Sequence, residues 1–268
     1  MEGAGAVVSR RRLLGLALGA ALLGPGVVGG YRYEETVLRV ELLPRGVRVV
    51  HVTDLHIHRG IPGWLLRRIT RIRPTILVVT GDTWDELTPW PPSAAIEALR
   101  KLAHYAKEAY AVLGNHEHWA ARRRGADPRV EAGRLYGEAG FQLLVDEATM
   151  GAGGVRICGL DWRDEPAGYG PALRRLLRRG CDLVVAHSPD VFHFAEPSVE
   201  SLYLTGHTHG GQVCLPGGRS LYTNSHYGYR WGLYTRGGSL MYVSRGLGEM
   251  LPPRLYCSRE LVLAEPVT

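Results

Sequence analysis

The chain has 268 residues, of which 45% are hydrophobic and 22% charged, a composition that excludes a largely disordered or fibrous protein. This length can bury one substantial core, so we expect one folded domain at 31–268 behind a short N-terminal segment at 1–30. The formal charge of +6 weakly favours anionic partners. No basic stripe is interleaved with aromatic residues, so we expect no nucleic acid as a partner.

The N-terminal segment has the features of an export signal. Arg10, Arg11 and Arg12 precede an uncharged, mostly apolar stretch at 13–30 that is diluted by glycines. Paired arginines before a moderately apolar stretch resemble a twin-arginine signal, which predicts export by the twin-arginine machinery and an extracytoplasmic location. No clear cleavage site follows, so the segment is predicted to be either a cleaved signal or an N-terminal membrane anchor.

The first part of the domain alternates short β-branched runs with amphipathic stretches. We expect neighbouring strands at 37–43 and 47–53, joined by a turn at 44–46. The elements predicted next are a helix at 62–72, a strand at 76–80, a helix at 94–107 and a strand at 109–113. This order predicts parallel strands joined by right-handed crossovers.

A second series of predicted strands follows, interrupted by helices near 130–139 and 171–179. The strands are expected at 141–145, 155–160, 183–186, 202–205, 240–243 and 260–264. Two sheets packed face to face with helices outside would satisfy this pattern. The segment 222–234, rich in glycine and aromatic residues, is either a long hairpin or a loop near the functional site.

The four cysteines are widely separated in the sequence. Cys158, Cys181, Cys214 and Cys257 form no Cys-x-x-Cys pair, so they do not resemble zinc ligands. Most of them lie in apolar runs, where free cysteine behaves as a small hydrophobic residue. We therefore expect packing residues rather than disulfides.

Five predicted strands end in polar clusters. The clusters are Asp54-Leu55-His56, Gly81-Asp82-Thr83-Trp84-Asp85, Gly114-Asn115-His116-Glu117, His187, and Gly206-His207-Thr208-His209. Oxygen and imidazole donors without thiolates suit divalent Mn, Fe, Co or Zn. Seven candidate ligands are too many for one ion and predict a dinuclear site with a bridging carboxylate. A single aspartate at a strand end is more often a turn former or a helix cap, but five such clusters together favour metal binding.

In order and spacing, these five motifs resemble the calcineurin-like metallophosphoesterases, over nearly the whole chain after Tyr31. The segments from Gly206 to Gln212 and from Ser244 to Gly248 resemble a bacterial, twin-arginine-exported branch of that superfamily. That branch includes phosphodiesterases and enzymes that act on the pyrophosphate of UDP-2,3-diacylglucosamine. The resemblance implies an α/β fold for 31–268, a four-layer α-β-β-α sandwich of two mixed sheets flanked by helices.

The resemblance also implies roles for individual residues. One metal would be held by Asp54, His56, Asp82 and His209, and the other by Asp82, Asn115, His187 and His207. The two metals would be divalent Mn, Fe or Zn, bridged by Asp82. His116 would donate a proton to the leaving oxygen, oriented by Asp85. Arg245, in its Ser-Arg-Gly-Leu-Gly setting, would bind the substrate phosphate.

The expected activity is therefore metal-dependent hydrolysis of an envelope or lipid-linked phosphoester, with possible membrane association. Two alternatives belong to other classes. A metal-dependent DNA exonuclease is disfavoured, because the chain has no additional DNA-binding region and carries a predicted export signal. A non-catalytic phosphate-binding scaffold is disfavoured, because none of the expected ligands is missing.

Overall fold

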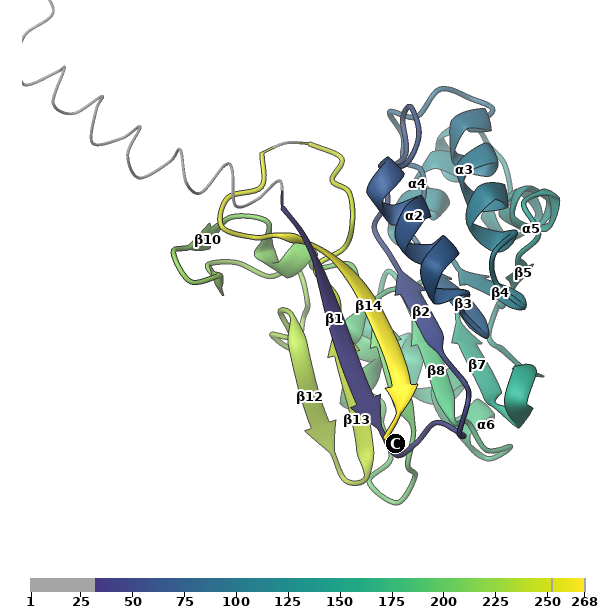
Figure 1. Ribbon diagram of the computed structural model, residues 1–268, viewed down its shortest axis with the longest axis vertical. Helices are drawn as coiled ribbons and strands as arrows, with labels where there is room; N and C mark the ends of the chain where they lie inside the picture. The colour runs from purple at the N-terminus through teal and green to yellow at the C-terminus, as the bar shows by residue number, and fades with distance from the viewer. Residues whose placement is uncertain (1–31, 252, 268) are drawn as a thin grey trace, which may run out of the picture.

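The computed structural model describes residues 32–251 and 253–267. Two six-stranded sheets pack face to face in it (Figure 1). The predicted signal or anchor at 1–30 lies outside the described residues. Within the described ranges, no helix has both the length and the apolar character needed to cross a membrane.

The first sheet has the order β1-β14-β2-β3-β4-β5. Its strands are β1 (Tyr33–Val40), β2 (Val49–Val52), β3 (Ile76–Thr80), β4 (Glu108–Val112), β5 (Gln142–Leu143) and β14 (Arg259–Pro266). The strands β2, β3 and β4 are parallel, as predicted, and β5 is parallel to β4. Their carboxyl ends therefore meet at one edge of the sheet.

The predicted pairing of the first two strands is wrong. β14 lies between β1 and β2, parallel to β1 and antiparallel to β2 (Figure 1). β14 is buried over most of its length, whereas β1 has several exposed or half-buried positions. An apolar strand gains most from an interior position and a partly polar strand is suited to an edge, so the C-terminal strand takes the central place.

The second sheet has the order β12-β13-β9-β8-β7-β6. Its strands are β6 (Glu147–Met150), β7 (Arg156–Leu160), β8 (Leu183–Ala186), β9 (Leu202–Thr205), β12 (Gly232–Arg236) and β13 (Ser239–Val243). The four inner strands are parallel and the two edge strands antiparallel. Of the segment 222–234, only the end belongs to a strand, β12. A separate small hairpin joins β10 (Cys214–Leu215) to β11 (Arg219–Ser220).

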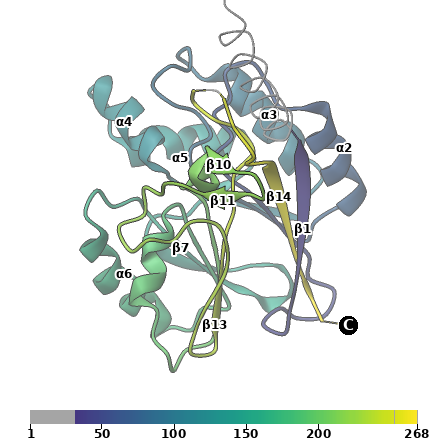
Figure 2. The same ribbon diagram turned by 90° about the vertical axis from the view of Figure 1, so that its left-hand side faces the viewer.

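Helices cover the outer faces of both sheets. Those associated with the first sheet are α2 (Gly63–Ile72), α3 (Ser93–Ala103), α4 (Asn115–Arg123) and α5 (Pro128–Glu138). The second sheet is covered by α6 (Tyr169–Leu177), which lies far from α2 and α3 in Figure 2. Four short 3₁₀ turns are η1 (Ala152–Gly154), η2 (Pro166–Gly168), η3 (Pro189–Phe194) and η4 (His209–Gly211).

The apolar side chains form a core on each side of both sheets. Between the sheets, Ile76 and Val78 of β3 pack in one cluster with Leu183 of β8. Their neighbour Leu77 faces the other way and belongs to the cluster that contains Leu65 of α2. Successive strand residues point to opposite faces, so strands covered on both faces are apolar throughout. The predicted four-layer α/β sandwich with two mixed sheets is confirmed.

The expectation of four unbridged cysteines is wrong for one pair. Cys158 of β7 and Cys181, which precedes β8, form a disulfide. The two strands are neighbours in the sheet, and this brings together two cysteines separated by 23 positions in the sequence. Cys214 and Cys257 are free and buried, as expected.

Candidate metal centre

The predicted ligands follow the carboxyl ends of five strands. Asp54 follows β2, Asp82 follows β3, and Asn115 begins α4 shortly after β4. In the second sheet His187 follows β8, and both His207 and His209 follow β9. Parallel strands deliver such residues to a common edge, where open α/β sheets bind ligands. The structure brings all seven predicted ligands together there.

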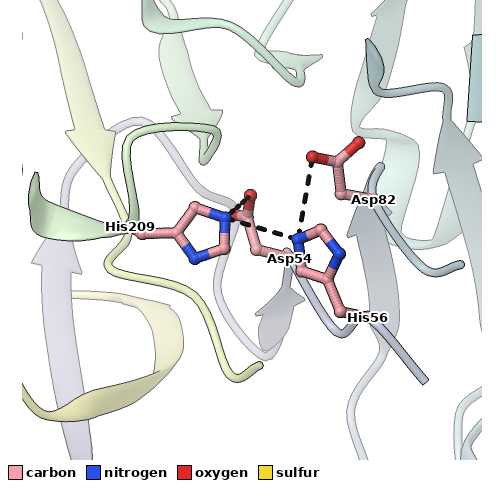
Figure 3. Close-up of side chains that lie close together, drawn as sticks. All are labelled: Asp54, His56, Asp82 and His209. Carbon is pink, nitrogen blue, oxygen red and sulfur yellow. Dashed lines mark hydrogen bonds and ion pairs between the residues drawn. The ribbon is translucent and has the colours of Figure 1, made fainter. Parts of the chain in front are cut away.

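Four side chains form the first group of potential metal donors: Asp54, His56, Asp82 and His209. One donor atom from each lies within 4.8 Å of the other three (Figure 3). The Nε2 atom of His209 is 3.4 Å from Asp54 Oδ1 and 3.3 Å from His56 Nε2. His56 Nε2 is 3.9 Å from Asp82 Oδ2. The donors therefore converge on one small volume.

The second group contains Asp82, His187 and His207, whose donor atoms also lie within 4.8 Å of one another. His187 Nε2 is 3.1 Å from Asp82 Oδ2 and 3.1 Å from His207 Nδ1. The Asn115 Oδ1 atom is 3.1 Å from the same His187 nitrogen. Asp82 is the residue common to both groups.

The donor set fits divalent cations. Several ring nitrogens face one another in the centre, and a neutral imidazole can donate a hydrogen bond from only one of its nitrogens. On the far side of the rings, His187 Nδ1 lies 2.7 Å from the Thr80 carbonyl oxygen and His56 Nδ1 lies 3.0 Å from Asp85 Oδ2. These contacts place the proton on Nδ1, which leaves Nε2 as the metal-facing lone pair.

The electrostatics of the site keep Asp82 charged and the imidazoles of His207 and His209 neutral. Burial alone would raise the pKa of Asp82, but the rings of His187, His116 and His56 together outweigh it and hold the pKa well below its usual value. Burial also opposes the charged form of His187, yet attraction to Asp82 raises its pKa to about 9. Burial, assisted by His187, lowers the pKa of His207 to about 3. Burial and then Arg254 lower the pKa of His209 well below its usual value.

The backbone of the ligand residues is strained. Five ligands have positive φ: Asp54 (52°), His56 (43°), Asp82 (52°), His207 (71°) and His209 (49°). Non-glycine residues rarely adopt this conformation, and such strain clusters at functional sites that the surrounding fold holds in place. The positive-φ conformation directs side chains that are two positions apart in the sequence toward a common centre.

Two glycines in the motifs are required by close packing against carboxylates. A Cβ atom at Gly114 would overlap Asp82 Oδ1, and one at Gly206 would overlap Asp54 Oδ2. The residue before Asn115 and the residue before His207 must therefore lack a side chain. This explains why both motifs begin with glycine.

Residues 47–211 match the sequence family described as calcineurin-like phosphoesterase. The chain belongs to this family. It is 30% identical to the metallophosphoesterase YkuE of Bacillus subtilis, over 96% of each chain. It is 29% identical to the phosphodiesterase YaeI of Escherichia coli, over 82% of each chain. It is also 23% identical to the UDP-2,3-diacylglucosamine pyrophosphatase LpxG of Chlamydia muridarum, over 81% of this chain and 83% of LpxG.

The structure does not place Asp85 as predicted in this calcineurin-like phosphoesterase. Asp85 Oδ2 lies 3.0 Å from His56 Nδ1 and 3.3 Å from His58 Nε2, so it supports a metal ligand. The partner of His116 is Glu86, whose Oε2 atom lies 2.5 Å from His116 Nδ1. The Asp85 side chain is fully buried and that of Glu86 is 15% exposed, so the carboxylate in contact with His116 is that of Glu86.

The position of Arg245 differs from the prediction that this residue binds the substrate phosphate. Its guanidinium group contacts Glu34 Oε2 at 2.8 Å and Glu260 Oε2 at 3.2 Å. Two carboxylates therefore neutralise its charge, and Arg245 does not line the pocket over the donor groups. Further along the same segment, the Gly248 N–H donates to the Asp54 carbonyl oxygen at 2.6 Å. The segment that contains Arg245 therefore holds the backbone of Asp54, a predicted metal ligand.

Sequence reasoning assigned no role to Glu117 or Arg254. Glu117 is buried and accepts backbone N–H groups from Asp82, Thr83 and Gly114 at 2.7–2.9 Å, which fixes the turns that carry two ligands. Glu117 could have been found from the sequence, because it is the last residue of the Gly-Asn-His-Glu motif. The buried Arg254 has Nη2 3.1 Å from His209 Nδ1, and nothing distinguishes it in an arginine-rich sequence.

Proposed function

We propose that this chain is a dinuclear metal-dependent phosphodiesterase or pyrophosphatase. Its family and its phosphodiesterase and pyrophosphatase relatives make it a metal-dependent phosphoester hydrolase. The single observation that supports a pair of metals is the position of Asp82, which contributes to both donor groups. One carboxylate shared by two donor sets is the arrangement expected when two cations act on one phosphoryl group.

In the proposed centre, one cation binds Asp54, His56, Asp82 and His209. The other binds Asp82, Asn115, His187 and His207. Divalent Mn, Fe or Zn suits these donors. Two such cations supply activation of the attacking water and neutralise charge on the phosphoryl oxygens.

The protein's own contribution to the leaving group comes from His116. Its ring lines the pocket, with Nε2 4.0 Å from Asp82 Oδ2 and Nδ1 against Glu86. The Glu86 carboxylate at Nδ1 orients the ring, so that Nε2 is the atom of His116 available to give a proton to the departing oxygen. Glu86 is thus a positioning residue for the proposed general acid.

The proposed substrate is an envelope or lipid-linked phosphoester resembling UDP-2,3-diacylglucosamine. LpxG, one of the relatives, is named a UDP-2,3-diacylglucosamine pyrophosphatase. Met250 and Leu251 line the pocket beside the polar donors, and apolar walls of this kind suit an acyl chain. Export by the twin-arginine machinery, with the N-terminal segment either cleaved or retained as a membrane anchor, would bring the enzyme to such substrates; the support is the sequence of residues 9–30.

The test is metal reconstitution of the purified protein. Loaded with Mn²⁺, it is expected to hydrolyse an aryl phosphodiester, and Asp82→Asn is expected to lose both activity and bound metal, measured by elemental analysis. Asp127→Asn is the matched control, because Asp127 caps α5 away from the centre. An Asp82→Asn protein that retains both metals and full turnover would contradict the shared ligand. Comparison of UDP-2,3-diacylglucosamine with an unacylated nucleotide sugar then tests the substrate class.

A further inference from the structure

Two free thiols lie behind the loop that carries His209. Cys214 belongs to β10, and Cys257 lies just before β14. Both side chains are buried, and the two thiols interact electrostatically. The metal centre as described uses neither of them.

The backbone holds these two segments side by side. Val213 and Leu255 form a parallel bridge, in which the Cys214 N–H donates to the Leu255 carbonyl at 2.9 Å. The Leu255 N–H donates to the Gln212 carbonyl at 3.0 Å. Tyr256 then has a positive φ of 51°, which turns the chain so that Cys257 meets Cys214. The contact between the thiols is therefore fixed by the fold.

The same thiols pack against η4. Cys257 Sγ donates to the His209 carbonyl at 3.1 Å, and Cys214 Sγ donates to the Gly210 carbonyl at 3.3 Å. A Cβ atom at Gly210 would lie 2.8 Å from Cys257 Sγ, so the loop has no space to move toward the pair. Any change in the bonding of these sulfurs acts directly on the backbone of His209.

We propose that Cys214 and Cys257 form a second disulfide under oxidising conditions, and that this bond fixes η4 to the C-terminal segment. The chain already contains one disulfide, Cys158–Cys181. The new bond would remove the two S–H donors to η4, but it would close the loop between residues 214 and 257 and tie β10, which follows η4, covalently to the C-terminal segment, and this tether restricts the movement of His209. The proposed site is one of redox modification and does not depend on the nature of the substrate.

The reaction is thiol–disulfide exchange with a small-molecule disulfide such as glutathione disulfide. The thiolate of one cysteine attacks the oxidant and releases one glutathione, which leaves a mixed disulfide. The second cysteine attacks the protein sulfur of that mixed disulfide and releases the second glutathione. The two cysteines together lose two electrons and two protons, which the two glutathione thiols gain. Because the thiols are buried, exchange takes place during folding or local opening.

The test is refolding of the full, reduced chain in a glutathione redox buffer, followed by alkylation, digestion without reductant and mass spectrometry. We expect a peptide pair joined through Cys214 and Cys257 in addition to the Cys158–Cys181 pair. A parallel sample in excess dithiothreitol is the control and should yield four alkylated cysteines. A map in which Cys158 and Cys181 are joined, while Cys214 and Cys257 are alkylated or carry separate glutathiones, would overturn the proposal.

A second measurement tests the effect on the loop. The oxidised protein, loaded with Mn²⁺ and dialysed against a chelator, is expected to release metal from the His209 group roughly tenfold more slowly than protein whose Cys214–Cys257 pair is reduced. Cys214→Ser and Cys257→Ser should each abolish this difference. The joint variant Cys158→Ser/Cys181→Ser should keep it. Equal release from the oxidised and reduced forms would rule out a role for the bond in holding His209.

Discussion

The two donor groups of the metal centre share Asp82 but differ in how the protein supports them. In the second group, His187 is buried and its Nδ1 atom faces a backbone carbonyl at the end of β3. In the first group, His209 lies on the short turn η4, and its Nδ1 atom faces the Arg254 guanidinium. An arginine N–H can only donate, so it favours the ring form that carries its proton on Nε2, the atom that faces the proposed cation.

The two proposed cation positions are therefore not equivalent. The Thr80 carbonyl favours the neutral tautomer of His187 that leaves Nε2 free to bind a cation, whereas Arg254 favours the opposite tautomer of His209. We therefore expect the His187 group to bind its cation more tightly than the His209 group.

The two motif glycines offer the most disruptive test. Gly114→Ala places a methyl group against Asp82, the shared ligand, and should abolish binding of both cations. Gly206→Ala places the same methyl group against Asp54, which belongs to the first group alone, and should spare one cation. Elemental analysis of the two variants measures the difference. Gly137→Ala, on the surface of α5 with open space around it, is the matched control.

Removal of a single imidazole should separate the two affinities. Titration of the metal-free protein with Mn²⁺ is expected to show two steps, separated roughly tenfold or more. His209→Asn should remove the weaker step and His187→Asn the tighter one, as followed by isothermal calorimetry. If His187→Asn leaves the tighter step in place, the two positions have been ranked in the wrong order.

Substitution of the proposed general acid should slow hydrolysis and leave the metal content unchanged. His116→Gln is expected to slow phosphodiesters with poor leaving groups by about 10²-fold, and activated aryl esters less, because only a poor leaving oxygen needs the proton. Glu86→Gln should show the same dependence of the rate on the leaving group, but more weakly. Asp85→Asn is the contrasting variant, since Asp85 contacts His56 and should lower metal retention instead. A uniform loss over all leaving groups in His116→Gln would count against acid catalysis.

The stability of the metal-free protein should depend on pH through His187. Burial disfavours its charge, but Asp82 raises its pKa to about 9, above the value of about 6.5 in the unfolded chain. The ion pair therefore contributes fully below pH 6.5 and is lost as the pH rises through 9. The free energy of unfolding should fall over that range by about 1.4 kcal/mol for each unit of the pKa shift. Urea unfolding at several pH values measures it, with His187→Gln as the variant that should lose this dependence.

The ligand positions could be predicted because each donor is encoded in a short segment. Asp82 and His187 directly follow apolar runs that form strands, and parallel pairing is enough to bring their ends together. The same apolar runs located β3, β4, β8 and β9, whereas the four-layer order came from the family resemblance. The prediction of the ligand positions required no knowledge of distant contacts, because the motifs at the ends of parallel strands meet at one edge of the sheet.

The errors arose where distant segments meet. The insertion of β14 beside β2 depends on a strand more than 200 positions away in the sequence, and so does the contact of Arg245 with Glu34. The choice between Asp85 and Glu86 as the partner of His116 depends on a turn of the chain that composition does not reveal. The Cys158–Cys181 bond likewise follows from the register of two strands.

The position of β14 has a consequence for how the protein reaches its native state. β14 separates β1 from β2, so β1 has no hydrogen-bonding neighbour in its sheet until a strand more than 200 positions later in the sequence has been made. Contacts between segments so far apart form slowly, because a long loop must close before they stabilise anything. Until β14 has emerged from the ribosome, the first sheet therefore lacks the strand that joins β1 to β2.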